Sequence, residues 1–578
     1  MGSKIALFGC PTAKALETIG EIELAERLPH PMIDGEWAKT ARSATASYLI
    51  IEFDGNDLDR ALEITKKAGL KYLYHGEPFK TWGHFVLNEK TFPENWASMK
   101  KYVERAKLQG INLGVHTLSN FITPNDSYVT PLPDQRLAKV GECSITDDID
   151  NKSDEVPISS PQFFNQMKNN SLYSVMIGNE IVRYKEVSAS KPWKLTGCTR
   201  GAFNTQAISH KKGDKIGKLM DHGYKVFLSD ASLSEDIAKN IAHLFNEAGL
   251  MQISFDGLEG VWSTGMGQYA VSLFTKTWYD HLKPELKGKV INDASMPSHF
   301  NWHINTRYNW GEPWGAGFRE GQTSLRMMNQ DFFRRNLLPS MLGWFNMSGE
   351  TTIEDTEWLL ARAAGFDAGF AFNLSYRNVD RNGQSDAIFK AINTWETARM
   401  AGAFTAEQKL KMEDIHNEFH LESAGNQVWA LYPYNIKRFI HEQKIRQPGE
   451  PVFSTFEFEN PYKDQPMMFL LTLVPSDKTG GSSVEMISFE VNNIKIEIPL
   501  NLESFQNLKL DETGNLQVYD RNWKLLKIID MKEKLPKLVK GKNKIIFDAV
   551  FKGEPLSNIK IEMKTIGDVE NVKAVAGR

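Results

Sequence analysis

The sequence predicts an α/β fold: a (β/α)8 TIM-type barrel with a β-rich insertion after strand 3 and a C-terminal antiparallel β-sandwich. From residue 47, short apolar runs alternate with amphipathic helical patterns, which indicates parallel strands joined by helices. Seven or eight such repeats favour a closed barrel over an open sheet. No Gly-x-Gly-x-x-Gly motif follows the first strand, which disfavours a dinucleotide-binding sheet.

A length of 578 residues is too great for one hydrophobic core, so we expect several domains. We predict an N-terminal segment over 1–46, a catalytic barrel over 47–420 with its β-rich insertion at 124–225, and a β-sandwich over 421–578. The sandwich is indicated by period-two alternation, as in Ile494-Lys495-Ile496-Glu497-Ile498. We expect it to brace the barrel, with carbohydrate binding as the alternative role.

The predicted barrel strands are residues 48–53, 72–74, 111–115, 250–255, 289–292, 341–345 and 369–374. Residues 428–432 are either the eighth strand or the start of the next domain. Helices are predicted near 13–27, 58–68, 95–109, 236–248, 268–282, 324–337, 354–364, 387–401 and 406–419.

Polar side chains follow nearly every predicted strand. In chain order the strand ends carry Asp54, His75 and Glu77, His116, Asp256 and Glu259, Asp293, Asn346 and Asn373. Because barrel active sites form at the C-terminal ends of the strands, we expect several of these groups to contact substrate. The alternative for each is a structural role, such as capping the next helix or bridging two loops.

The run from Ile253 to Gly260 holds the most informative of these strand ends. It passes from an apolar strand into two carboxylates, Asp256 and Glu259, set among glycines. Two carboxyl groups near one pocket can divide nucleophile and acid/base roles, which predicts glycosidic-bond hydrolysis. A simple polar turn with its acids near a helix N-terminus is the alternative.

The segment 301–314 is rich in polar and aromatic residues and predicts a loop on the rim of the barrel. Its candidate site residues are Asn301, Trp302, His303, Arg307, Tyr308, Trp310, Glu312 and Trp314. Flat tryptophan rings suit stacking on the C–H faces of sugars, although they also pack loops onto a barrel.

Two enzymatic hypotheses and one non-enzymatic hypothesis follow. In the first, a glycoside hydrolase uses Asp256 as nucleophile and Glu259, Glu312 or Glu77 as acid/base. In the second, a polysaccharide lyase uses Arg307 to neutralise a uronate, with His303 or Tyr308 moving the proton. In the third, the chain binds glycans without cleaving them.

An aspartate at the end of the fourth strand, here Asp256, resembles the arrangement in the clan of α-galactosidase-like barrel glycosidases. The resemblance covers the barrel only and rests on strand position. It implies a second catalytic aspartate after the sixth strand, and this sequence has no clear match for it.

Composition limits the partners. A net charge of −4 argues against nucleic-acid binding, and no apolar run is long enough to span a membrane. We expect a carbohydrate substrate and no cofactor, with Ca²⁺ as the alternative at the acidic cluster Asp126, Asp147, Asp148, Asp150 and Asp154. Met1-Gly2-Ser3 resembles an expression scar in place of a leader, so we expect an extracytoplasmic protein.

Overall fold

The computed structural model describes residues 5–165, 171–294, 296–309, 311–312, 317–443, 447, 449–477, 480–511, 513–529 and 535–574. Its central sheet contains β3 (Tyr48–Ile50), β4 (Tyr72–His75), β5 (Asn112–Leu118), β15 (Gln252–Asp256), β16 (Ile291–Ala294), β17 (Arg307–Tyr308), β18 (Met341–Asn346) and β19 (Gly369–Asn373). The hydrogen-bonded order is β17-β16-β15-β5-β4-β3-β19-β18, in which each strand lies beside its neighbour in the chain, and β3 lies beside β19. A parallel bridge from Tyr308 to Ser340 closes the ring, so the predicted (β/α)8 barrel is confirmed.

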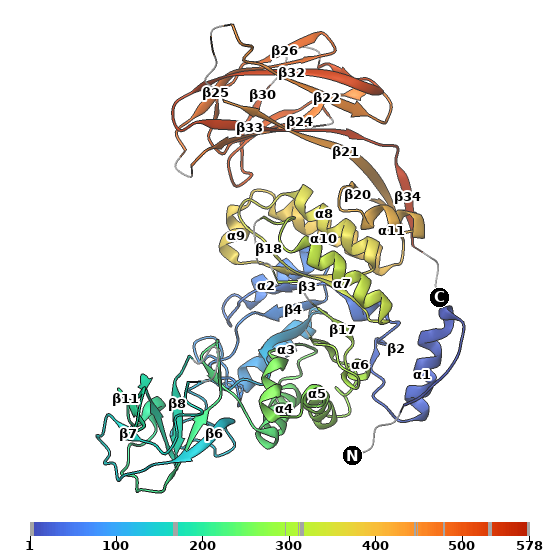
Figure 1. Ribbon diagram of the computed structural model, residues 1–578. Coiled ribbons are helices and arrows are strands. Elements are labelled where there is room, and N and C mark those ends of the chain that lie inside the picture. The colour runs from blue at the N-terminus through green and yellow to red at the C-terminus, as the bar shows by residue number, and fades with distance from the viewer. Residues whose placement is uncertain are drawn as a thin grey trace. The chain divides into compact units, whose positions relative to one another are not determined.

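Helices follow the strands around the barrel (Figure 1). They are α2 (Leu58–Lys67), α3 (Trp96–Lys107), α4 (Ala231–Ala248), α5 (Gln268–His281), α6 (Asn301–Ile304), α7 (Thr323–Arg335), α8 (Ile353–Phe366), α9 (Tyr376–Arg381), α10 (Ser385–Met400) and α11 (Ala406–Glu413). In α4, the Asp230 side chain caps the first turn by accepting from the Leu233 amide at 2.8 Å. Gly249 ends the helix at φ 76°. The apolar face of α4, which includes Ile241 and Phe245, is buried.

The sixth barrel strand differs from the sequence prediction. It is the two-residue strand β17, inside the segment expected to be a rim loop. The run predicted as the sixth strand is therefore the seventh, β18, and the run predicted as the seventh is the eighth, β19. Residues 428–432 belong to a strand of the C-terminal sheets, because they pair with β20 (Glu418–Gly425) and β34 (Glu570–Lys573).

The predicted β-rich insertion is confirmed between β5 and α4. It contains β6 (Lys139–Ser144), β7 (Val156–Pro157), β8 (Ser174–Ile177), β9 (Glu180–Arg183), β10 (Glu186–Val187), β11 (Lys194–Thr196), β12 (Lys215–Leu219), β13 (Asp221–His222), β14 (Val226–Phe227) and the 3-10 turn η3 (Ala202–Asn204). Sheets β6-β12-β8-β9 and β10-β11-β7 enclose a core of their own, with Val175, Leu195 and Ile216 fully buried. The free thiols of Cys143 and Cys198 lie in or against this core, and burial raises the pKa of Cys198 to about 12.

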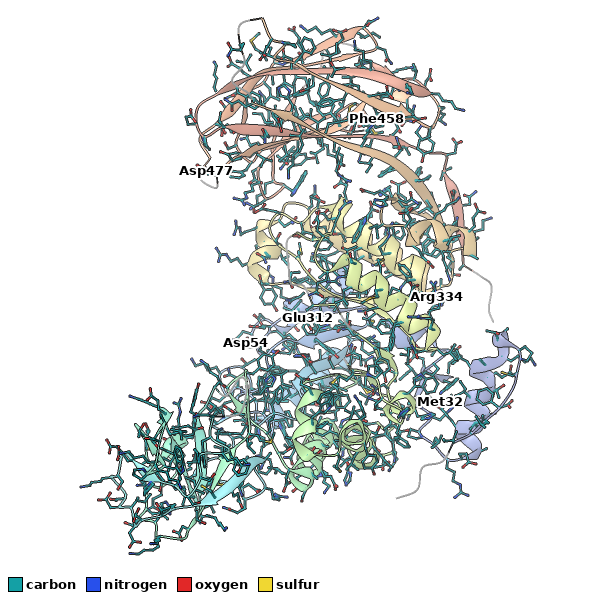
Figure 2. The ribbon with its side chains drawn as sticks, viewed as in Figure 1. Met32, Asp54, Glu312, Arg334, Phe458 and Asp477 are labelled. Atoms are coloured by element: carbon teal, nitrogen blue, oxygen red, sulfur yellow. The ribbon has the colours of Figure 1, made fainter. Side chains whose placement is uncertain are left out.

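The C-terminal part forms two antiparallel sheets. One contains β20 (Glu418–Gly425), β21 (Val428–Glu442), β24 (Met468–Pro475), β28 (Asn507–Leu510), β29 (Leu516–Tyr519), β30 (Leu525–Ile529), β33 (Ser557–Ile566) and β34 (Glu570–Lys573). The other contains β22 (Ser454–Asn460), β25 (Ser483–Val491), β26 (Ile494–Ile498), β27 (Leu502–Glu503) and β32 (Gly541–Lys552), while β23 (Gln465–Pro466) pairs with β31 (Lys537–Leu538). Residues of both sheets share one core, in which Phe458 is fully buried (Figure 2).

The N-terminal segment carries η1 (Thr12–Lys14), α1 (Ala15–Ala25), the hairpin of β1 (Met32–Ile33) and β2 (Glu36–Trp37), and η2 (Arg42–Thr45). The chain divides into two compact units, with one comprising residues 1–63, 71–310 and 331–341, and the other residues 64–70, 311–330 and 342–578. Within the described ranges, no helix is long and apolar enough to cross a membrane.

Candidate active site at the barrel strand ends

The register of the barrel strands brings three titratable side chains to the same side of the sheet. Ser254 of β15 pairs with His116 of β5 on one side and with Asp293 of β16 on the other. Paired residues of parallel strands face the same way, and Asp256 lies two residues beyond Ser254. His116, Asp256 and Asp293 therefore form a row across three adjacent strands. His116 Nε2 lies 3.8 Å from Asp256 Oδ2.

A glycine turn sets the second carboxylate next to this row. After Asp256 the chain turns at Gly257, with φ 73°, into the 3-10 helix η4 (Leu258–Thr264), which carries Glu259 in its first turn. A side chain at Gly257 would also press on the Leu118 backbone at 3.2 Å, and one at Gly260 would meet the Phe121 ring at 2.8 Å. The glycines at these two positions thus allow η4 to pack closely on the end of β5.

The electrostatic environments of Asp256, Glu259 and His116 are linked. Burial raises the pKa of Glu259, and the negative charge of Asp256 raises it further, while the Glu259 amide and His222 act in the opposite direction. Burial lowers the pKa of His116 against the charges of Asp256, Asp293 and Glu77, which raise it. The Asp256 side chain is 33% exposed and that of His116 is 21% exposed, so solvent reaches both.

Two members of this cluster were missed in the sequence. Glu52 follows β3, and its pKa is raised by partial burial and by the charge of Glu77. The run 48–53 did contain the signal, since residues 48, 50 and 52 share one side of a strand. His222 comes from β13 of the insertion and stacks on Phe121, with ring centroids 4.8 Å apart. No pattern in the sequence indicated that the insertion would place the His222 ring near Glu259.

His75 and Asp54 have structural partners in the barrel. His75 is buried between Phe53 and Phe92, and its Nε2 lies 3.0 Å from the Phe53 carbonyl oxygen. Burial lowers the pKa of His75 to about 4. Asp54 follows β3 (Figure 2), where its Oδ1 accepts from the Asn56 amide at 2.7 Å, immediately before α2. Both side chains thus have partners within the protein, and neither contact requires a substrate.

The segment 301–308 is part of the barrel wall and not a rim loop. His303 Nδ1 lies 2.6 Å from the buried Glu23 carboxylate of α1, which also holds His30 at 2.7 Å. Because His303 precedes β17 and Asp256 ends β15, the parallel strands place them at opposite ends of the sheet. The Trp302 indole donates to the Asn336 carbonyl at 3.1 Å.

Asn301 and Tyr308 bind each other in the interior of this segment. Both side chains are fully buried, and the Tyr308 hydroxyl donates to Asn301 Oδ1 at 3.1 Å. Burial raises the pKa of Tyr308, which opposes loss of its proton. The side chains that the lyase hypothesis assigns to elimination are therefore bound to other parts of the protein. His303, Tyr308 and Arg307 do not form a common site.

Arg307 forms a fully buried ion pair with Asp293, so the Asp293 side chain, which was predicted to bind substrate, has no exposed surface. Its Nε donates to Asp293 Oδ2 at 2.9 Å, and its Nη1 donates to the carbonyl oxygens of Ala44 and Ala46. The guanidinium also lies 5.2 Å from the centre of the Tyr48 ring. Arg307 thus binds a protein carboxylate in the barrel interior and is not available to a uronate.

The remaining candidates lie in the other compact unit or outside the described residues. The Asn373 amide donates to Asn346 Oδ1 at 2.9 Å, so the ends of β19 and β18 are bound to each other. The Glu312 carbonyl accepts from Arg326, whose pKa burial lowers to about 10 against the charge of Glu312. Trp310 and Trp314 lie outside the described residues.

Within the described ranges, no group of three or more His, Cys, Asp or Glu side chains could hold a metal ion. Members of the acidic cluster considered for Ca²⁺ have other partners. Asp126 lies 2.7 Å from His84 Nδ1, Asp148 accepts from Lys211 at 2.8 Å, and Asp150 accepts from Ser153 at 2.8 Å.

No family model and no curated protein sequence matches the chain. Among solved structures, an α-galactosidase of Geobacillus stearothermophilus is similar over 89% of this chain, at 8% identity and a TM-score of 0.36, and this chain spans 57% of its length. An isomalto-dextranase of Arthrobacter globiformis gives 8% identity over 93% and 99% of the two chains, with a TM-score of 0.37. A debranching enzyme of Nostoc punctiforme gives 10% identity over 71% and 92%, with a TM-score of 0.38. Similarity at this level assigns no reaction to the chain.

Proposed function

We propose that the chain is a glycoside hydrolase whose reaction is carried by Asp256 and Glu259. The observation that supports this most directly is the pair of carboxyl groups at the end of β15. Glu259 has its pKa raised by burial and by the charge of Asp256, whereas Asp256 is partly exposed beside His116. Carboxyl groups held in different environments can act as proton donor and as nucleophile, which is the division that glycosidic cleavage requires.

In this proposal Asp256 attacks the anomeric carbon and Glu259 protonates the leaving oxygen. A glycosyl ester then forms on Asp256, and Glu259 removes a proton from the water that hydrolyses it. Glu77, whose charge acts on both His116 and Glu52, is the alternative proton donor. His116, which is partly exposed beside Asp256, lies where it would contact a sugar hydroxyl, since imidazole groups bind hydroxyls well. We also propose an extracytoplasmic location, where a polysaccharide substrate would be met.

The decisive experiment replaces Asp256 by Asn, which preserves shape and removes the nucleophile. We expect Asp256→Asn to fold normally and to lose at least about a thousandfold of the hydrolytic activity, an order typical of essential catalytic groups. The assay would screen neutral and uronate-containing polysaccharides and record product masses and ultraviolet absorbance. Hydrolysis adds water to the products, whereas elimination leaves an absorbing unsaturated uronate.

Asp280→Asn provides the matched control, because Asp280 lies at the surface of α5, where it pairs with Lys287 at 3.3 Å. It should keep wild-type activity. Full activity in Asp256→Asn, or products that carry the unsaturated chromophore, would overturn the proposed reaction.

A further inference from the structure

A cavity of about 460 Å³ lies in the inserted β-domain, on the sheet β6-β12-β8-β9. Its walls are formed by Gln135, Lys139, Glu142, Met176, Gly178, Asn179, Ile208, Ser209, His210, Asp214 and Lys215. The volume falls within the range of small-molecule binding sites, which is roughly 300–1,000 Å³. None of these residues belongs to the cluster around Asp256.

One wall of the cavity is fixed by a buried carboxylate. Glu180 is fully buried and accepts from Arg200 Nε at 2.9 Å, from the Gly201 amide at 2.8 Å and from the Ile208 amide at 3.1 Å. His210 Nε2 lies 2.8 Å from the same carboxylate. Burial acts to raise the pKa of Glu180, but these hydrogen bonds outweigh it and lower the pKa to about 2. The loop that presents Ile208, Ser209 and His210 is therefore held in place before any ligand binds.

The chemistry of the walls suits a neutral ligand rich in hydroxyl groups. The charges of two lysines balance those of two carboxylates, and Lys139 lies 3.2 Å from Glu142. The cavity thus presents many donors and acceptors without a net field that would favour an ion. Ile208, which is 40% exposed, adds apolar surface of the kind that the C–H face of a sugar can cover.

We infer that this cavity is a binding subsite for a neutral saccharide, separate from the proposed catalytic site. It would hold the chain of a polysaccharide on the insertion while cleavage takes place in the barrel. The choice of a saccharide as ligand rests on the proposed function. The cavity and the hydrogen bonds that fix its wall are structural features that do not depend on the proposed function.

The test uses the full-length chain in native gels that contain dextran, pullulan, galactomannan or polygalacturonate. The variant Asn179→Ala/Lys215→Ala removes two exposed polar groups from the cavity and leaves Glu180 and the core intact. The control Asn151→Ala/Lys152→Ala removes the same residue types from an exposed turn of the insertion outside the cavity. Both double variants lose one positive charge, so their mobilities in plain gels should match.

We expect at least one neutral polysaccharide to retard the wild type and the control, and the cavity variant to bind it at least about tenfold more weakly, the loss expected for one or two hydrogen bonds. Asp256→Asn should be retarded like the wild type. If no glycoside is hydrolysed but this pattern is found, the subsite stands and the proposed reaction fails. Equal retardation of both double variants, retardation by polygalacturonate alone, or no retardation in any gel would overturn the subsite.

Discussion

At the scale of single residues, the strongest chemical signal is the contrast between two carboxyl groups that lie three positions apart. Asp256 sits at the partly open end of β15, and Glu259 lies in the glycine-flanked turn that packs on β5. Withdrawal from water penalises the charged form of Glu259, and the neighbouring carboxylate penalises it again. Glu259 therefore keeps its proton to a higher pH than a free glutamate does.

This property predicts the pH dependence of catalysis. A proton donor works while it is protonated, so activity should be present below the raised pKa of Glu259 and fall as the pH increases through it. Glu259→Gln should remove this alkaline limb and lower kcat/KM by about a hundredfold to ten-thousandfold for natural glycosides. For aryl glycosides with acidic leaving groups, kcat/KM should fall much less, because such a leaving group departs without being protonated. The measurement is kcat/KM against pH for both substrate types.

Glu104→Gln, an exposed change on α3, is the control and should reproduce the wild-type profile. An alkaline limb that persists in Glu259→Gln would assign the proton to another group, with Glu77 the first to examine. Equal losses for both kinds of leaving group would contradict a proton-donating role.

At the scale of elements, the sequence predicted the alternation of strands and helices but missed one strand. The longer barrel strands have apolar runs, whereas β17 contains only Arg307 and Tyr308. Two residues have no periodicity, and an arginine is not expected inside a barrel. The polar content of 301–308 therefore suggested a rim loop, although His303 and Asn301 form hydrogen bonds within the fold. Asp256 and Glu259 do follow a barrel strand, as expected from the apolar run and abrupt polar end of β15, while their catalytic roles stay a prediction.

The buried pair of Arg307 with Asp293 predicts a coupling between β17 and β16. Arg307→Met should cost about 3–5 kcal/mol, because it leaves a buried carboxylate without its cation. Asp293→Asn/Arg307→Met should recover much of that loss, since neither charge then remains. Hydrogen exchange of peptides covering β16 and β17, followed by mass spectrometry, would measure the local opening free energies. Additive effects of the two single changes would show that the pair does not link the strands.

At the scale of the whole molecule, the chain contains several separate cores. The C-terminal sheets enclose one around Phe458 and Leu471, and the insertion encloses another around Val175 and Leu195. The change from helical to period-two patterning predicted the first, and the interrupted βα rhythm predicted the second. The sequence could not predict which insertion residues reach the barrel, as His222 does, because that depends on the path of a chain held by non-local pairing.

Separate cores predict separate unfolding transitions. Phe458→Ala should remove about 3–5 kcal/mol from the C-terminal sheets, and Leu195→Ala should remove about 2–5 kcal/mol from the insertion, because each leaves a cavity in a closely packed core. Scanning calorimetry of the full-length chain should show each variant lowering the temperature of a different transition, with the remaining transitions unchanged. A single transition that both variants shift alike would mean that the cores unfold together, so that the insertion and the C-terminal sheets stabilise one another through the barrel.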